Sequence, residues 1–429
     1  MNPETSQASL KTYARQQSFW FVLVSGTLFG LVLNFIAPAF PAMRETFGAT
    51  LEQLGRLQLI YFAGGTVFGL AGGWVALRFG PRRGMIIALV MVVAGMLAFG
   101  FARTLVGMQI GAALCGVGSM GILVMDGAII SRVFAARRQS VFILLGLTGA
   151  IGGSGGAAIM GRWIVYAGGN GLDWRLAALF IAGLLSLFII WGLLLRIPVS
   201  GNSEREKEAE GLWTVTMRVI QRPEFLIATF WMFLHGLAQI GMMSWIGLIF
   251  QARHGLDAAQ TAYFIALNGA GFFAGRVLLS WVTSRWRIRE LSLLSISGIG
   301  SGLLFALVIV SPGYLSGLVV FSIAGMVTSG NAPSVQSWLG AVFGSRIASA
   351  FALMSGIANI GCAIGPYITG IIGTWFGLET GIWFMPGFML MLGITALIWR
   401  LKEHRSQAIG DTRIKSSEIV PQELQELRT

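Results

Sequence analysis

The segment LAALFIAGLLSLFIIWGLLL, at residues 176–195, runs for twenty residues without a charge. A helix of about 20 apolar residues is long enough to cross the hydrocarbon core of a bilayer. Runs of this kind recur along the chain, and they predict an all-α integral membrane protein with twelve transmembrane helices. The predicted spans are 19–41, 54–77, 84–102, 105–131, 139–164, 174–196, 223–250, 258–283, 291–311, 313–338, 347–372 and 378–401.

The composition also indicates a membrane location. Hydrophobic residues make up 55% of the 429 residues and charged residues only 11%, whereas about a quarter of a soluble globular chain is charged. The 59 glycines favour closely packed membrane helices. Residues 1–18 are polar, and the apolar run after them is too long for the core of a cleaved signal peptide, so we take 19–41 as the first span.

A charged segment divides the predicted spans into two groups of six. It contains SGNSEREKEAE at residues 200–210. The polar sequence after residue 401 has the composition of a disordered tail. We therefore expect an amino-terminal tail at 1–18, six-helix bundles at 19–199 and 223–401, a linker at 200–222 and a largely disordered tail at 402–429.

The distribution of lysine and arginine predicts the orientation. If both termini are cytoplasmic, 23 basic residues lie inside, 6 lie outside and one lies within a helix. Cytoplasmic loops of membrane proteins carry this excess of positive charge. The net charge of +12 is thereby explained without a nucleic-acid partner. We place the protein in a bacterial cytoplasmic membrane and expect a monomer.

Two similar sequences end the second and eighth predicted spans. The first is GWVALRFGPRR at 73–83, and the second is SWVTSR at 280–285. Repetition at equivalent positions is expected of a transporter built from two structural repeats.

The first of these sequences resembles the loop motif of the major facilitator superfamily, G-x-x-x-D-R-x-G-R-R. The resemblance covers about residues 19–401 and implies two pseudo-symmetric six-helix bundles that work by alternating access. In that family the aspartate helps to lock the cytoplasmic side. Leu77 replaces it here, so we expect this gate to work differently. The residues that match the gating loop are Gly73, Arg78, Gly80, Arg82 and Arg83.

Glycine-rich sequences recur in the fifth and eleventh predicted spans, as GGSGG at 152–156 and GCAIGPYITG at 361–370. The first resembles the family's antiporter motif, although Gly153 stands where that motif has proline. Both sequences are equally explained as sites where helices pack closely.

Three ionisable residues lie well inside the predicted spans: Asp126, His235 and Arg276. A charge within lipid costs several kcal/mol, so such residues normally face a cavity or a partner. They are the first candidates for transport chemistry.

Asp126, in the fourth span, is a candidate proton carrier; the alternative is a structural residue paired with Arg132. In carriers resembling fucose permeases, an acidic residue in the fourth helix has the proton role, and a second acid lies in the first helix. This chain has Asn34 there, within NFIAP at 34–38. Asn34 is therefore a candidate for substrate binding, although the lost charge counts against a sugar.

Arg276, in the eighth span, is a candidate substrate residue. Carriers resembling the bacterial monocarboxylate and oxalate types place an arginine in this helix that binds the substrate carboxylate. A guanidinium offers a planar fork that matches a carboxylate. The alternative is a gating residue that bonds helix ends on the cytoplasmic side.

His235 and Gln239 lie four residues apart in the seventh span and share one helix face. Histidine changes charge near neutral pH, so His235 is a candidate for both substrate binding and proton coupling. It equally suits an interhelical hydrogen bond. Asn268 and Asn331 complete the polar candidates for substrate binding.

Enzymes and metal proteins are not indicated. The chain has no phosphate-binding loop, and Ser154 lies within a predicted membrane helix, outside the strand–turn–helix context of a nucleophile. The two cysteines, Cys115 and Cys362, fall in apolar spans and are expected to be packing residues. We expect no metal and no cofactor.

These observations favour a secondary transporter that moves a small organic anion with protons. Two alternatives keep the same fold: a neutral sugar–proton symporter and an efflux antiporter for drugs or metabolites. A third, from a different class, is a membrane sensor or assembly partner that does not transport.

Overall fold

The computed structural model describes residues 3–134, 137–169, 174–195, 220–286, 288–343 and 347–418, and the regular secondary structure in these ranges is all helical. Eleven helical segments there are long and apolar enough to cross a membrane. α3, a helix of 28 residues, lies at the remaining predicted span, 54–77. The helices are α1 (Pro3–Leu33), α2 (Ile36–Phe47), α3 (Leu51–Arg78), α4 (Gly80–Gly100), α5 (Leu105–Val133), α6 (Arg138–Gly169), α7 (Trp174–Leu194), α9 (Pro223–His254), α10 (Ala258–Trp286), α11 (Glu290–Ile309), α12 (Tyr314–Thr328), α13 (Asn331–Phe343), α14 (Ile347–Phe376), α15 (Leu378–Ile382) and α16 (Phe384–Glu418).

Three predicted spans are each broken into two helices by a proline. Pro38, Pro333 and Pro386 lack the N–H that would bond to the carbonyl four residues earlier. The breaks between α1 and α2, α12 and α13, and α15 and α16 lie three to four residues before these prolines. As a result, the backbone carbonyls of Asn34 and Ser329 receive no helical hydrogen bond from Pro38 and Pro333.

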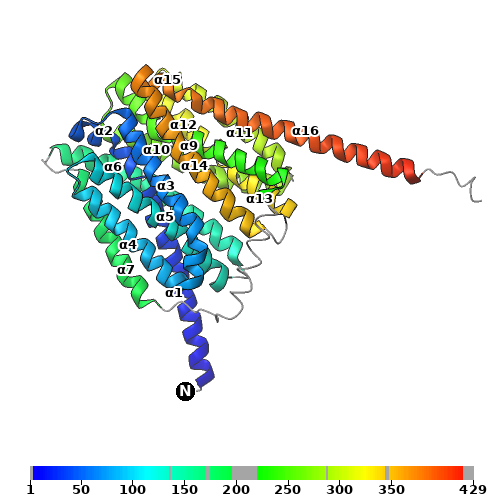
Figure 1. Ribbon diagram of the computed structural model, residues 1–429, viewed down its shortest axis with the longest axis horizontal. Coiled ribbons are helices and arrows are strands. Elements are labelled where there is room, and N and C mark those ends of the chain that lie inside the picture. The colour runs from blue at the N-terminus through cyan, green and yellow to red at the C-terminus, as the bar shows by residue number, and fades with distance from the viewer. Residues whose placement is uncertain are drawn as a thin grey trace, which may run out of the picture.

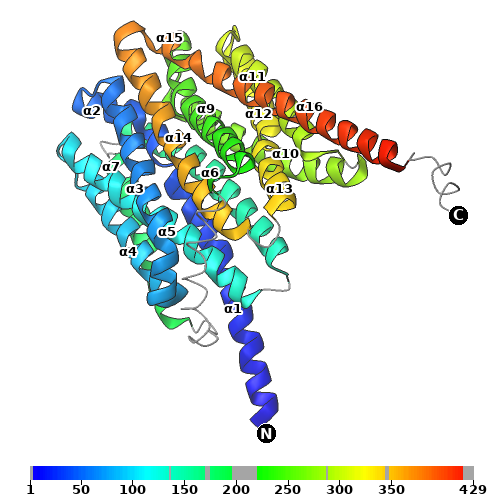
Figure 2. The same ribbon diagram turned by 45° about the vertical axis from the view of Figure 1, so that its right-hand side comes forward.

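The two predicted bundles are confirmed. Within the first, α1 packs on α6 and α3 on α5; within the second, α9 packs on α14 and α10 on α12. The halves meet mainly through two helix pairs, α3 with α14 and α6 with α10, and α2 adds contacts to α9 and α10. Figures 1 and 2 show α1 leaving the bundle at one end, while α2 and α15 lie at the opposite end. We call this opposite end, with the start of α3 and the end of α14, the closed end.

Both glycine-rich sequences are close-packing sites. A β-carbon added at Gly152 would overlap the Thr27 carbonyl of α1, and one at Gly365 would overlap the Leu237 carbonyl of α9. Small residues allow backbones in membranes to approach this closely. The contacts join the equivalent helix pair in each half, so the sequence repeat reflects repeated packing.

The chain ends differ from the predicted tails. α1 begins at Pro3 rather than near residue 19, and α16 continues to Glu418, where we expected a disordered tail from 402. Eight of the 17 residues at 402–418 are good helix formers, none is proline, and the next proline is Pro421, beyond the helix. The predicted linker at 200–222 lies largely outside the described residues.

Candidate functional site

Arg276 lies on α10 at the boundary between the halves. Its guanidinium carbon is 4.9 Å from the centre of the Phe272 ring, one helical turn earlier. A β-carbon added at Gly146 of α6 would lie only 2.8 Å from its Nη1 atom, so the side chain reaches the other half at a position without a side chain. The glycine provides the space for the guanidinium.

Arg276 has no acidic partner within the described part of the chain, where ion pairs join Arg56 to Glu52 and Arg253 to Glu379. Its Nε atom is buried and has no hydrogen-bond partner. A buried cation left unpaired is costly. The position is therefore suited to an anionic ligand.

His235 lies on α9, within electrostatic range of the Arg276 guanidinium. Its Nδ1 atom is 3.5 Å from the Asn331 side-chain nitrogen, at the start of α13. Asn331 in turn accepts a hydrogen bond of 2.5 Å from the Ser297 hydroxyl of α11. The structure thus brings two predicted residues, His235 and Asn331, together, with Arg276 within electrostatic range of His235.

Gln239 and Asn268 form a separate pair. The Gln239 amide donates to Asn268 Oδ1 at 3.0 Å, and the Asn268 amide donates to the Phe321 carbonyl of α12 at 2.8 Å. These bonds tie α9, α10 and α12 together. Gln239 Oε1 is buried and has no hydrogen-bond partner among the described residues, so Gln239 still has an acceptor to offer a ligand.

Asp126 is apart from this group. It lies on α5, only 1% exposed, and both of its carboxyl oxygens are 2.7 Å from the Ser25 hydroxyl of α1. The predicted alternative, an ion pair with Arg132, involves a side chain outside the described residues. The two charged residues predicted inside the membrane, Asp126 and Arg276, do not pair with each other.

Asn34 lies at the break between α1 and α2. Its amide donates to the Gly30 carbonyl at 3.2 Å and packs against Gly153 of α6. It is partly exposed, so it remains available to a ligand. The proline break places Asn34 in the turn directly after α1.

The gating loop joins α3 to α4. Gly80 has a φ of 77°, in the left-handed region where glycine is favoured. Arg82 donates hydrogen bonds to the carbonyls of Gly192 and Leu193, at the end of α7. Arg78 and Arg83 are exposed, and the surroundings of Gly73 lie outside what the structure describes. The loop therefore contributes a cap on a neighbouring helix.

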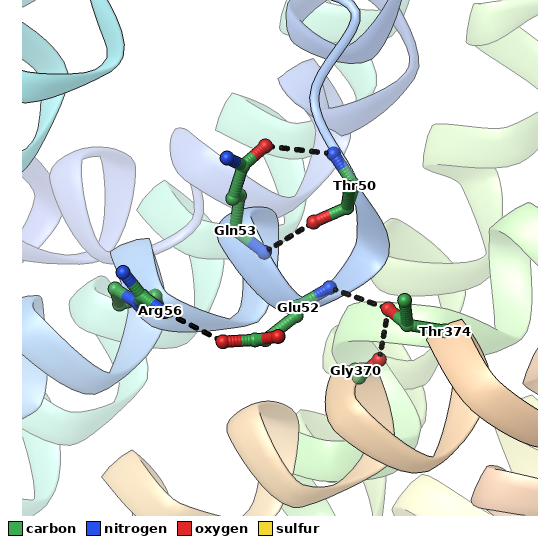
Figure 3. Close-up of polar contacts among 6 residues, drawn as sticks. All are labelled: Thr50, Glu52, Gln53, Arg56, Gly370 and Thr374. Atoms are coloured by element: carbon green, nitrogen blue, oxygen red, sulfur yellow. Dashed lines mark hydrogen bonds and ion pairs between the residues drawn. The ribbon is translucent and has the colours of Figure 1, made fainter.

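The closed end is held by a contact between α3 and α14 that the sequence did not reveal. The first turn of α3 has a capping box, in which Thr50 and Gln53 bond to each other's backbone. In the same turn, the Glu52 backbone N–H donates to Thr374 Oγ1 of α14 at 3.1 Å. The Thr374 hydroxyl in turn donates to the Gly370 carbonyl at 2.9 Å (Figure 3). One hydroxyl thus connects the two halves.

Aromatic packing adds to the closed end. The Trp245 ring of α9 lies 5.3 Å from the Phe40 ring of α2, across the boundary. Its indole nitrogen donates to the Pro366 carbonyl at 2.9 Å. On α14 that carbonyl also lies near Gly55 of α3, where an added β-carbon would be 2.8 Å away.

Several of these residues were missed by sequence reasoning: Ser25, Ser297, Gly146, Glu52 and Thr374. All are small or polar residues without a motif, and their partners lie far away in the chain. No group of three metal-ligating side chains occurs in the ranges that the structure describes.

The Major Facilitator Superfamily model matches residues 22–326 and 291–428, which is nearly the whole chain. This chain belongs to the major facilitator superfamily. It is therefore a membrane transporter, and not an enzyme. A comparison with curated proteins gives no match.

Solved structures of the superfamily share the fold at low sequence identity. A bacterial homolog of the human lysosomal transporter Spinster, inward-facing and occupied, is 15% identical with a TM-score of 0.70, covering 90% of this chain and 96% of that one. The nucleoside transporter NupG, as a mutant, is 14% identical with a TM-score of 0.74, covering 90% and 99%. A D-xylose–proton symporter is 14% identical with a TM-score of 0.72, covering 89% and 96%.

Proposed function

We propose that this superfamily member carries a small organic anion together with protons, by alternating access. The observation that supports the anion is the guanidinium of Arg276, which has no acidic partner among the residues that the structure describes. A carboxylate beside it would supply the missing charge and accept from the free Nε–H. Bidentate pairing of this kind is among the strongest hydrogen bonding in proteins.

His235 and Asn331 are proposed to complete the anion site. They come from α9 and α13, whereas Arg276 comes from α10 and reaches Gly146 in the opposite half. A ligand bound here would touch both halves. Such a ligand would couple its own binding to the rocking of the two bundles.

Asp126 is proposed to carry the proton. It is buried, and within the described residues its side chain bonds to the Ser25 hydroxyl rather than to a cation. His235 is the second candidate, because it lies beside the anion site. We place both termini in the cytoplasm of a bacterium and the closed end outside, following the positive-inside bias.

The test compares Arg276→Gln with Arg285→Gln, an exposed arginine on the same helix. Purified proteins are screened by thermal shift against carboxylates, sulfonates, sugars and amino acids, and hits are tested for uptake in proteoliposomes. We expect a carboxylate to stabilise wild type and Arg285→Gln, while Arg276→Gln binds it at least about ten-fold more weakly, the loss of a charge-assisted bond. Equal uptake of every anion by both variants would refute the assignment.

A neutral, hydroxyl-rich solute is the second candidate. It is favoured by the free Oε1 acceptor of Gln239, which needs a donor such as a hydroxyl. Two of the similar structures are those of a nucleoside transporter and a D-xylose–proton symporter. This candidate predicts that a sugar or nucleoside stabilises wild type and Arg276→Gln alike, and that Gln239→Leu abolishes the shift.

A further inference from the structure

A groove of about 400 Å³ lies between α6 and α10, on the flank of the molecule. It is lined by Ala158, Ile159, Arg162, Trp163 and Tyr166 from α6 and by Tyr263 from α10. Ile159 is 68% exposed and Tyr166 60%. In a membrane-spanning bundle such apolar exposure on the flank faces lipid, so the groove opens to the bilayer.

The lining changes in character along the helix axis. Ala158 and Ile159 are apolar, and Arg162 and Tyr166 follow one and two turns nearer the end of α6 at Gly169. From Ala158 to Tyr166 the axis rises by about 12 Å. The groove is therefore apolar toward the membrane centre and polar toward the closed end, as a lipid molecule is.

Two donors at the polar part of the groove lack acceptors. The Arg162 guanidinium carbon is 6.0 Å from the centre of the Tyr263 ring, and no acidic side chain pairs with it in the described ranges. The Trp163 indole Nε1 is buried without a hydrogen-bond partner. A buried N–H without an acceptor costs free energy. A ligand with negative oxygens satisfies both groups.

We propose that this groove binds an anionic phospholipid, with its phosphate at Arg162 and Trp163 and an acyl chain along Ala158 and Ile159. The positive charge selects for a net negative headgroup. The apolar part toward the membrane centre and the opening to the flank favour a lipid over a dissolved anion. This site is separate from the proposed anion site at Arg276.

The lipid would also bridge the two halves. Tyr263 belongs to the second half, and the groove exists because α6 and α10 approach closely, with an added β-carbon at Gly161 lying 2.9 Å from the Ala258 carbonyl. A ligand that binds one of two conformations shifts the population toward it. An anionic lipid is therefore expected to favour the conformation in which the two halves are in contact at the closed end.

The experiment measures lipid binding directly, so that it does not depend on transport or on the Arg276 proposal. The full chain is reconstituted in phosphatidylcholine vesicles with spin-labelled phosphatidylglycerol or spin-labelled phosphatidylcholine, and motionally restricted lipid is measured by electron paramagnetic resonance. Wild type is compared with Arg162→Gln and with the matched control Arg103→Gln, an exposed arginine between α4 and α5.

We expect wild type and Arg103→Gln to prefer phosphatidylglycerol and Arg162→Gln to bind it about ten-fold more weakly, the effect of one charge-assisted hydrogen bond. Ile159→Trp keeps the arginine but fills the groove, and it is expected to lose the preference too. The proposal is overturned if wild type does not distinguish the two lipids or if both arginine variants lose the preference equally. Displacement of the labelled lipid by inorganic phosphate would also overturn it, because a dissolved anion would then suffice.

Discussion

The Ser25 hydroxyl has one proton and three oxygens within bonding distance. The Val22 carbonyl lies at 2.8 Å, and the two carboxyl oxygens of Asp126 lie at 2.7 Å. If Ser25 donates to Val22, Asp126 must be protonated and donate to Ser25. If Asp126 is ionised, the hydroxyl turns and donates to it. Rotation of one hydroxyl thus accommodates both protonation states.

This geometry predicts the effect of Asp126→Asn. The asparagine amide can donate to Ser25 as a protonated carboxyl does, so we expect the fold to be kept. The variant cannot release a proton, so uptake driven by a pH gradient should fall at least about ten-fold, while substrate exchange at equal pH is retained. Both are measured in proteoliposomes loaded with the substrate found by thermal shift.

The control is Asp257→Asn, at the exposed start of α10, where the side chain accepts from the Gln260 N–H. Asparagine also caps helices well, so transport should be unchanged. Gradient-driven accumulation at the wild-type rate in Asp126→Asn would remove Asp126 from the proton path and leave His235.

At the scale of the element, prolines determine where two candidate substrate residues lie. The breaks before Pro38 and Pro333 place Asn34 and Asn331 at interrupted helices. A break in a membrane helix is tolerated where it lines a cavity or is buried in protein. Asn331 was chosen from the sequence as a polar residue alone, and Asn34 through the resemblance of its segment to fucose permeases. The prolines were an additional signal for both.

The loop between α3 and α4 provides a prediction for stability. Arg82→Gln removes charged hydrogen bonds to the carbonyls of Gly192 and Leu193, at the end of α7. A cation at a helix end contributes roughly 0.3–2 kcal/mol, so we expect the free energy of unfolding to fall by about 1 kcal/mol. It can be measured by denaturant titration in mild detergent.

Arg83→Gln is the matched control, because Arg83 is the next residue and is exposed. A surface substitution of this kind usually changes stability by less than about 0.5 kcal/mol. Equal losses in the two variants would show that the loop acts only through its net charge, for example at lipid headgroups.

At the scale of the whole molecule, the closed end controls which conformation is populated. The Thr374 hydroxyl is a direct polar link between α3 and α14 (Figure 3). Thr374→Val leaves the Glu52 N–H without its acceptor, and Thr374→Ser retains the hydroxyl. A net hydrogen bond is worth about 1 kcal/mol, which changes the ratio of the two conformations roughly five-fold.

We expect Thr374→Val to populate a conformation in which α3 and α14 separate at the closed end. Thr374→Ser should behave as wild type. Double electron–electron resonance between spin labels at Arg103 and Leu315, which are exposed residues of the two halves, reports the separation. The labels require a protein in which Cys115 and Cys362 have been replaced. An unchanged distance distribution in Thr374→Val would show that this end is held without the Thr374 hydroxyl, by packing such as that at Trp245 and Gly55.

The sequence by itself determined the class and the plan of this protein. Apolar runs long enough to cross a bilayer admit few structures besides helices, because each backbone group must be bonded within lipid. The two groups of six spans, the repeated loop and the rarity of charges within the spans followed from the same constraint. The twelve helices, the two bundles and the superfamily were therefore predictable before any coordinates.

Only the tertiary structure decided which side chains meet. Ser25 and Asp126 are separated by 101 residues, and Ser297 and Asn331 by 34. Glycines that look alike in the sequence have different neighbours. Gly152 leaves room for the backbone of α1 at Thr27, whereas Gly146 leaves room for the guanidinium of Arg276. Hydrophobicity fixes that a helix is in the membrane, but it does not fix its rotation or its neighbours. Those depend on packing between segments distant in the chain, and the sites at Arg276, Asp126 and Arg162 arise from that packing.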